Sequence, residues 1–175
     1  MSYVFCIKNY VILLDSYDFG IWKFLHAVLT PKGQAKHKVS KKVWKFSILD
    51  SQEASVLHVK AYNDYKILLE KRREKYYQFN ITCQPIKIIV GETIDQLSEF
   101  YSVYGDISYK YKSFLEAVST TFKIHYVLNL EYQLESKLVW QFIQQYFFKI
   151  TDNYTSTSLS SFLSSLEESK VNQNF

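Results

Sequence analysis

The stretch "LTPKGQAKHKVSKKVWKFSILDSQEASVLHVKAY", residues 29–62, decides the predicted fold. Its first part is rich in lysine and is typical of a flexible loop. Apolar and polar residues then alternate over residues 43–49 and again over residues 56–62, and the polar run "DSQEAS" separates the two segments. Alternation has the period of a half-buried strand. The pattern therefore predicts a β-hairpin directly behind a basic loop.

The same periodicity arguments extend to the rest of the chain. The predicted strands cover residues 21–30, 43–49, 56–62, 79–90 and 120–132, and residues 3–14 form a further strand or a short buried element. The predicted helices cover residues 65–77, 93–104, 109–118 and 136–150. Asn63 or Asp64 can cap the first of these helices, and Pro85 favours an edge position or a bulge for its strand.

Composition bounds the class of protein. The 175 residues are 47% hydrophobic and 18% aromatic, which is enough for one domain with a proper core and an appendage. The formal net charge is +4, which by itself does not indicate a nucleic-acid-binding protein. No apolar run approaches the length of a membrane helix, and no secretion signal is evident, so we expect no membrane association.

The segment "KFSILDSQEASVLHVKAYNDYKILLE", residues 45–70, resembles part of an OB-fold: strand 2, a polar turn, strand 3 and the following helix. Asp50 and Ser51 occupy the turn. The resemblance implies a mainly β protein, a five-stranded OB-fold barrel with a helical insertion between strands 4 and 5 and a C-terminal helix. It divides the chain into an N-terminal strand or extension (1–19), the OB-fold domain (20–150) and a Ser/Thr/Asn-rich tail (151–175).

Among OB-fold proteins, the chain looks most like two groups of accessory subunits. One contains the small and middle subunits of the CST and replication protein A complexes. The other contains the shelterin-type subunit that recruits telomerase and its yeast telomerase-accessory relative. The resemblance implies a non-catalytic, nuclear subunit of a telomere, telomerase or replication complex at telomeric chromatin. Its partners would be other subunits, with single-stranded DNA or RNA as a further candidate.

The basic loop is the candidate nucleic-acid-binding site. Between Phe19 and Leu49 there are seven lysines and no acidic residue, and such a field attracts phosphate. The candidate residues are Lys32, Lys36, Lys38, Lys41, Lys42, Trp44 and Lys45. Trp44 and Phe46 could stack on bases if they faced outward. The alternatives are a solvated loop with both aromatic residues in the barrel core, or a loop that meets an acidic protein surface.

The closing helix is the candidate partner-binding site, because it is apolar over most of its circumference. The candidate residues are Leu138, Val139, Phe142, Ile143, Tyr146 and Phe147. Either the insertion 93–118 or another subunit covers this helix. An amphipathic patch in the tail, from Leu159 to Leu166, is a second docking candidate.

Enzymatic chemistry has no support in the sequence. The four histidines show no metal-ligand spacing with one another or with the cysteines. Four glycines cannot build a phosphate-binding loop, and no nucleophile signature occurs. We therefore expect no catalytic residues, no metal and no cofactor. Two other functions stay open: a protein-interaction scaffold that never touches nucleic acid, and an unrecognised α+β enzyme.

Overall fold

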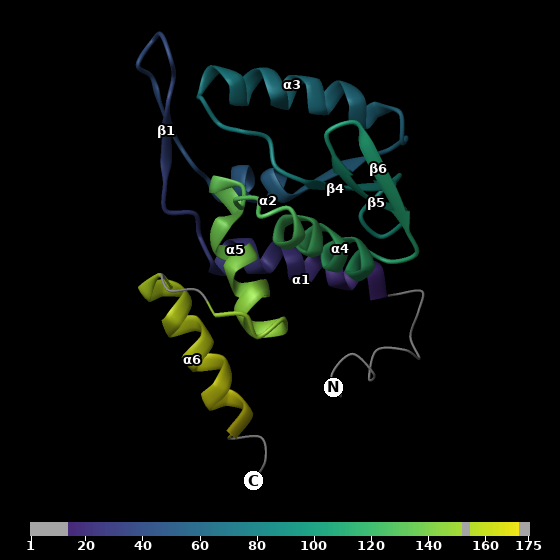
Figure 1. The fold of residues 1–175 in the computed structure, drawn as a ribbon. Helices are drawn as coiled ribbons and strands as arrows, with labels where there is room; N and C mark the ends of the chain where they lie inside the picture. The colour runs from purple at the N-terminus through teal and green to yellow at the C-terminus, as the bar shows by residue number, and fades with distance from the viewer. Residues whose placement is uncertain (1–13, 152–154, 172–175) are drawn as a thin grey trace.

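The computed structural model describes residues 14–151 and 155–171 (Figure 1). Nearly all of the element predicted over residues 3–14 lies outside this part of the chain. In chain order the elements are α1 (Leu14–Val28), β1 (Gln34–Lys36), β2 (Val43–Lys45), α2 (Ile48–Ser55), β3 (Val56–Val59), α3 (Asp64–Gln78), β4 (Ile86–Gly91), β5 (Leu97–Tyr104), β6 (Ile107–Tyr111), α4 (Phe114–Val127), α5 (Lys137–Phe142) and α6 (Thr157–Val171). A 3₁₀ turn (Leu134–Ser136) precedes α5, and a π-helical turn (Ile143–Phe147) continues it.

The central sheet has four strands in the order β3-β4-β5-β6. Strands β3 and β4 are parallel and are joined through α3, whereas β4, β5 and β6 form an antiparallel meander. The register places Val56 beside Lys87, and a bulge interrupts the β4–β5 pairing at Val90 and Gly91. Because β3 is an edge strand, one of its sides is open to the groove described below.

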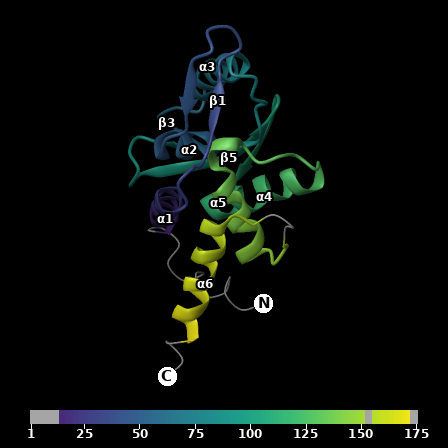
Figure 2. The same cartoon turned by 90° about the vertical axis from the view of Figure 1, so that its left-hand side faces the viewer.

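Helices cover both faces of this sheet, so the molecule has three layers (Figure 1). Helix α3 packs on one face through Tyr65 and Leu69, which join Ile88 and Val103 of the sheet in a small apolar cluster. Helices α1, α4 and α5 pack on the other face around a larger aromatic core. Helix α6 lies outside α5, at the opposite end of the molecule from the tip of the β1–β2 hairpin (Figure 2).

A lysine lies at the centre of the larger core. Lys87 of β4 is fully buried, and its ammonium nitrogen lies 3.8 Å from the ring centroid of Trp22 and 4.1 Å from that of Trp140. The indole faces favour an ammonium ion, but the amine has no hydrogen-bond partner in the described part of the chain, and burial lowers its pKa well below the usual value. His26 and His125 line the same core, where burial and then Lys87 lower the pKa of His26 to about 3.

The predicted β-hairpin over residues 43–62 is wrong. Its first strand shortens to β2 and pairs with β1, residues 48–55 form α2, and β3 pairs with β4 in parallel. A capping box starts α2: the Ser47 hydroxyl accepts a hydrogen bond from the Asp50 N–H at 3.0 Å, and the Asp50 carboxylate accepts one from the Ser47 N–H at 2.9 Å. This reciprocal pair satisfies two N–H groups that a helix start otherwise leaves unpaired.

Three other predicted elements are of the wrong type. Residues 21–30 belong mostly to α1 and residues 120–132 begin in α4, although both were expected to be strands, and much of the helix predicted over 93–104 is strand β5. In α1 the buried side chains are Phe19, Trp22, Leu25 and His26, and Leu29 directly after the helix continues the same helical period. Strand β5 is buried on both faces, so its sequence does not alternate.

The OB-fold barrel is therefore absent from the described part of the chain. Helices account for 51% and strands for 19%, and the two sheets, of two and four strands, do not close. The fold is an α/β sandwich and not a mainly β barrel. The resemblance is wrong because Asp50 and Ser51, which it places in a turn between two strands, lie inside helix α2.

Other predicted elements are present in the structure. The helix over residues 65–77 is α3, and the closing helix over 136–150 corresponds to α5 with its π-helical turn. The strand over residues 79–90 shortens to β4, which begins directly after Pro85. The missing N–H of this proline therefore removes no hydrogen bond from the sheet. None of the helices in the described residues is long and apolar enough to cross a membrane.

Candidate nucleic-acid interface

The lysine-rich stretch forms an ordered arm. Strands β1 and β2 pair to make a narrow hairpin, which we call the basic arm (residues 34–45), and it runs beside the end of α3 (Figure 1). The turn of the arm is organised by His37, whose Nδ1 accepts hydrogen bonds from the N–H groups of Val39 and Ser40 at 3.1 Å each. Lys41 closes the turn with a φ of 57°. The arm thus has a defined shape.

Aromatic packing fixes the arm to α3. The N–H of Lys38 donates to the C=O of Gln78 at 2.9 Å. The half-buried Trp44 has its ring centroid 6.0 Å from that of Tyr76 and 5.3 Å from that of Phe79, and Phe46 packs edge-on against it. Trp44 and Phe46 therefore lie neither in a barrel core nor on an open stacking surface.

The predicted nucleic-acid-binding lysines lie on or beside this arm. All six are exposed: Lys32, Lys36, Lys38, Lys41, Lys42 and Lys45. Two have partners within the chain, since Lys38 lies 3.6 Å over the ring of Tyr77 and Lys32 donates to the hydroxyl of Ser158. Among the described residues no partner binds the ammonium groups of Lys36, Lys41, Lys42 and Lys45. These four cations are available to a ligand.

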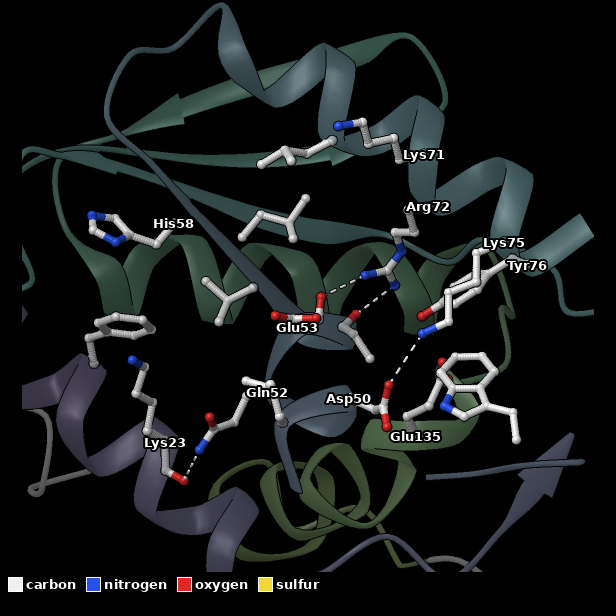
Figure 3. Close-up of a pocket in the computed structure, with 17 residues that line it drawn as sticks. Lys23, Asp50, Gln52, Glu53, His58, Lys71, Arg72, Lys75, Tyr76 and Glu135 are labelled. Atoms are coloured by element: carbon white, nitrogen blue, oxygen red, sulfur yellow. Dashed lines mark hydrogen bonds and ion pairs between the residues drawn. The ribbon is translucent and has the colours of Figure 1, made fainter. Parts of the chain in front are cut away.

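A groove of about 410 Å³ begins at the foot of the arm. It runs along the open side of β3, between α3 on one wall and α1 and α2 on the other (Figure 3). Its walls carry four cations, Lys23, Lys71, Arg72 and Lys75, and three carboxyl groups, Asp50, Glu53 and Glu135. Because Trp44 and Lys75 belong to the lining and Lys75 lies over the Trp44 ring, the groove and the arm are continuous.

Arg72 crosses the groove from α3 to α2 (Figure 3). Its guanidinium donates to the C=O groups of Glu53 and Ala54, both at 2.7 Å, and to Oε1 of Gln133 at 3.4 Å. These carbonyls end α2, and a cation at the C-terminal end of a helix is favourable. Arg72 therefore holds the two walls together.

Asp50 and Lys75 form an ion pair across the end of the groove. Their Oδ1 and Nζ atoms are 3.3 Å apart, and the same ammonium lies 3.6 Å from the Trp44 ring centroid. Burial alone would raise the pKa of Asp50, but hydrogen bonds from Ser47 and the charge of Lys75 together lower it. Asp50 is therefore a carboxylate at neutral pH.

The predicted partner-binding residues lie mostly inside the molecule. Val139, Phe142 and Ile143 are buried, and Leu138 and Tyr146 pack against the same aromatic core. Phe147, in contrast, is 62% exposed. The tail contributes to this core as well, because Leu159 of α6 is fully buried, and Phe162, Leu163 and Leu166 pack beside it. The chain itself therefore covers most of the apolar circumference of its closing helix.

Sequence reasoning missed the groove. No charged side chain of α3 is among the predicted binding residues. The structure instead gives Arg73 a pair with Glu70 at i,i+3 spacing and directs Arg72 and Lys75 towards α2. The S-x-x-D capping box at Ser47 could have revealed α2, which forms one wall of the groove, but not its position opposite α3.

Metal chemistry has no candidate in the described residues, where no group of three or more His, Cys, Asp or Glu side chains is placed to hold an ion. No known family model matches the chain, and no curated protein or solved structure shows significant similarity to it. The function must therefore be inferred from the arm and the groove themselves.

Proposed function

We propose that the protein is a non-catalytic nucleic-acid-binding module, and that its basic arm and groove hold a single strand. The observation that carries the proposal is a set of exposed lysines, without partners in the described part of the chain, on an arm that leads directly into a groove with further cations. Proteins that bind single strands combine a positively charged track for the backbone with aromatic side chains near the bases. The arm supplies the charged track, and Trp44, whose ring Lys75 covers in this conformation, lies where the arm meets the groove.

The distribution of charge supports this proposal better than the net charge does. The chain carries only +4 overall, yet the region from Phe19 to Leu49 holds seven lysines and no acid. The shape of the arm is fixed by its contacts with α3, so its lysines keep their spacing without a ligand. A preorganised cationic track costs little entropy when a phosphate backbone binds.

The dimensions of the groove favour a single strand over a duplex. A volume of about 410 Å³ lies within the range of pockets that enclose one small organic molecule, roughly 300–1,000 Å³. One nucleotide fits this range, whereas a duplex presents only its outer phosphates to such a groove. The arm would then follow the neighbouring phosphates.

The test is fluorescence anisotropy with labelled single strands of DNA and RNA, each fifteen nucleotides long, over a series of KCl concentrations. The wild-type protein should bind with an affinity that falls steeply with salt. Replacing Lys36, Lys41, Lys42 and Lys45 with Gln should reduce the slope of log K against log[salt] by roughly 3, because each lost phosphate contact on a single strand contributes about 0.7.

A matched variant controls for overall charge. Gln at Lys112, Lys123, Lys137 and Lys149 removes the same four charges from exposed positions outside the arm. This variant should keep the slope of the wild-type protein. Equal losses in both variants would show that the arm is not the site, and an absence of salt-dependent binding by the wild-type protein would refute the proposal.

A second candidate is the protein-interaction scaffold that never touches nucleic acid. One observation favours it: Tyr17, Ile21, Phe24 and Val28 form an exposed apolar stripe along α1, with Tyr17 and Phe24 66% and 64% exposed. Stripes of this kind often mark protein contacts. Failure of the isolated protein to bind any single strand in the titration would favour this candidate.

Membership of a telomere, telomerase or replication complex, and a nuclear location, stay predictions. They were drawn from the OB-fold resemblance, and the barrel on which it rested is absent from the described residues. The nucleic-acid proposal does not depend on them, because it rests on the arm and the groove.

A further inference from the structure

The end of the groove holds a carboxylate whose hydrogen-bonding capacity is unused. Glu135 is 1% exposed and lines the groove, and neither of its oxygens has a hydrogen-bond partner in the described part of the chain. It lies at the end where Asp50, Lys75 and Tyr76 lie (Figure 3). Buried polar groups in folded proteins are nearly always hydrogen-bonded, so two free acceptors here indicate a missing donor.

The neighbouring side chains do not supply that donor. Arg72 already donates to two backbone carbonyls of α2 and to Gln133. Lys75 is paired with Asp50 and lies over Trp44. Tyr76 is a close donor, since burial and the neighbouring Glu135 raise its pKa against the charge of Arg72, but no hydrogen bond of good geometry joins its phenol to either carboxylate oxygen.

We propose that Glu135 seats a guanine base of the single strand that the arm and groove bind, an inference that rests on the proposed function. The groove combines cations, which suit the phosphate, with one buried pair of acceptors, which suits a base edge with two adjacent donors. Guanine presents N1–H and N2–H₂ side by side on its Watson–Crick edge, and single-stranded bases are read on this edge.

The other bases do not match two acceptors. The same edge offers an acceptor beside the amino donor in adenine and in cytosine, and one N–H between two carbonyls in thymine and uracil. Each would place an oxygen or a ring nitrogen against the carboxylate. At a buried carboxylate, water does not compensate for this repulsion. The site therefore discriminates against the other three bases more strongly than an exposed site would.

Base entry requires side chains at this end of the groove to move. Both oxygens of Glu135 are covered in this conformation. Lys75 belongs to the same end of the groove, and its side chain is 46% exposed. A single ion pair whose ammonium is nearly half exposed is weak, so Lys75 can leave Asp50 and Trp44 for the phosphate of the incoming nucleotide. The uncovered Trp44 ring then offers a face to the base.

The test uses ten-residue oligonucleotides of thymidine, or of uridine in the RNA series, that carry a single central G, A, C or T/U. The wild-type protein should bind the G-containing strand about tenfold more tightly than the other three, as expected for one bidentate base contact. Glu135→Gln, which keeps the size of the side chain but replaces one acceptor with a donor, should abolish the preference and leave the affinity for the homopolymer and its salt slope unchanged.

Glu53→Gln is the matched control, because Glu53 is an exposed carboxylate of the same groove, and it should retain the G preference. Binding of all four strands with equal affinity by the wild-type protein would overturn the guanine site while leaving the proposed function intact. A preference that survives in Glu135→Gln would also overturn it. If no strand binds, the proposed function fails and the guanine site fails with it.

Discussion

The two faces of the central sheet use their charged residues in opposite ways. On the face covered by α1, α4 and α5, the core is closed, aromatic and thick, and it encloses Lys87, His26 and His125. On the α3 face, the apolar cluster is small, and the cations at its margin reach into an open groove and onto the arm. The closed face thus determines stability, whereas the margin of the open face is accessible to ligands.

This comparison shows why lysine content alone does not locate a binding site. Lys87 lies between two indole rings and is fully buried, so it is unavailable to a ligand. Lys36 and Lys41 are exposed and have no partner among the residues that the structure describes, so they are available. A test of the comparison must therefore separate changes in stability from changes in binding.

Low pH should destabilise the closed face, and this decrease in the free energy of unfolding is the largest effect expected. Burial and Lys87 hold the pKa of His26 at about 3, and burial holds that of His125 at about 4, although its hydrogen bond to Thr121 opposes the shift. The unfolded chain, with histidine pKa values near 6.5, binds more protons as the pH falls, so stability decreases below pH 6.5. Each histidine should lower the free energy of unfolding by about 3 kcal/mol at pH 4.

Urea unfolding between pH 7 and pH 4 measures this effect. Asp18 opposes part of it, because burial and the nearby Asp15 raise its pKa to about 6, so its protonation becomes easier in the folded state as the pH falls. A free energy of unfolding that stays constant over this range would show that the two histidines are not enclosed.

The second effect separates core from partner surface on the closing helix. Phe142→Ser should lower the free energy of unfolding by about 3–5 kcal/mol, because Phe142 is 3% exposed and its removal leaves a cavity. Phe147→Ser, at a 62% exposed position of the same helix, should change it by less than about 0.5 kcal/mol. The measurement is thermal unfolding monitored by circular dichroism.

If both variants instead kept the stability of the wild-type protein and changed only its state of association in sedimentation, the closing helix would be a partner surface.

Lys87→Met tests the buried amine. Burial without a hydrogen bond destabilises the amine, so the apolar replacement should be neutral or stabilise the fold by about 1 kcal/mol. Wild-type stability should rise with pH in the alkaline range, because burial lowers the pKa of Lys87 in the folded chain, which therefore releases this proton at a lower pH than the unfolded chain does. The variant should lack this rise. A loss of more than about 2 kcal/mol would show that the ammonium and the two indole rings stabilise the fold.

The smallest effect concerns the arm. Gln at Lys36, Lys41, Lys42 and Lys45 should change the free energy of unfolding by less than about 0.5 kcal/mol, because these exposed side chains contact no partner among the described residues. Chemical denaturation measures it. A larger loss would mean that these lysines support the fold, and their effect on binding would then need a different explanation.

The sequence predicted some of these elements and not others, for physical reasons. Residues 65–77 carry strong helix formers and form α3 as expected. In residues 21–30, in contrast, the alternation is compatible with a strand, and only the period of the buried Trp22, Leu25 and Leu29 reveals the helix. In residues 48–55, the capping box outweighs the alternation.

The candidate site was partly predictable. The lysines of the arm follow from the sequence alone, because a run of basic residues without acidic ones can be recognised whatever the fold is. The groove depends on α2 lying opposite α3, which no local pattern specifies. The burial of Glu135 and of Lys87 likewise depends on long-range packing, and charged residues are rarely found in such places.

The most direct test of the account is a map of amide chemical-shift changes in ¹⁵N-labelled protein during titration with a ten-residue single strand. We predict changes in the basic arm, α2 and the α2-facing side of α3, with none in the closed core around Lys87 beyond small propagated shifts. Changes confined to α4, α5 and α6, or no change at a saturating concentration of the strand, would contradict the claim that the arm and groove form the binding surface.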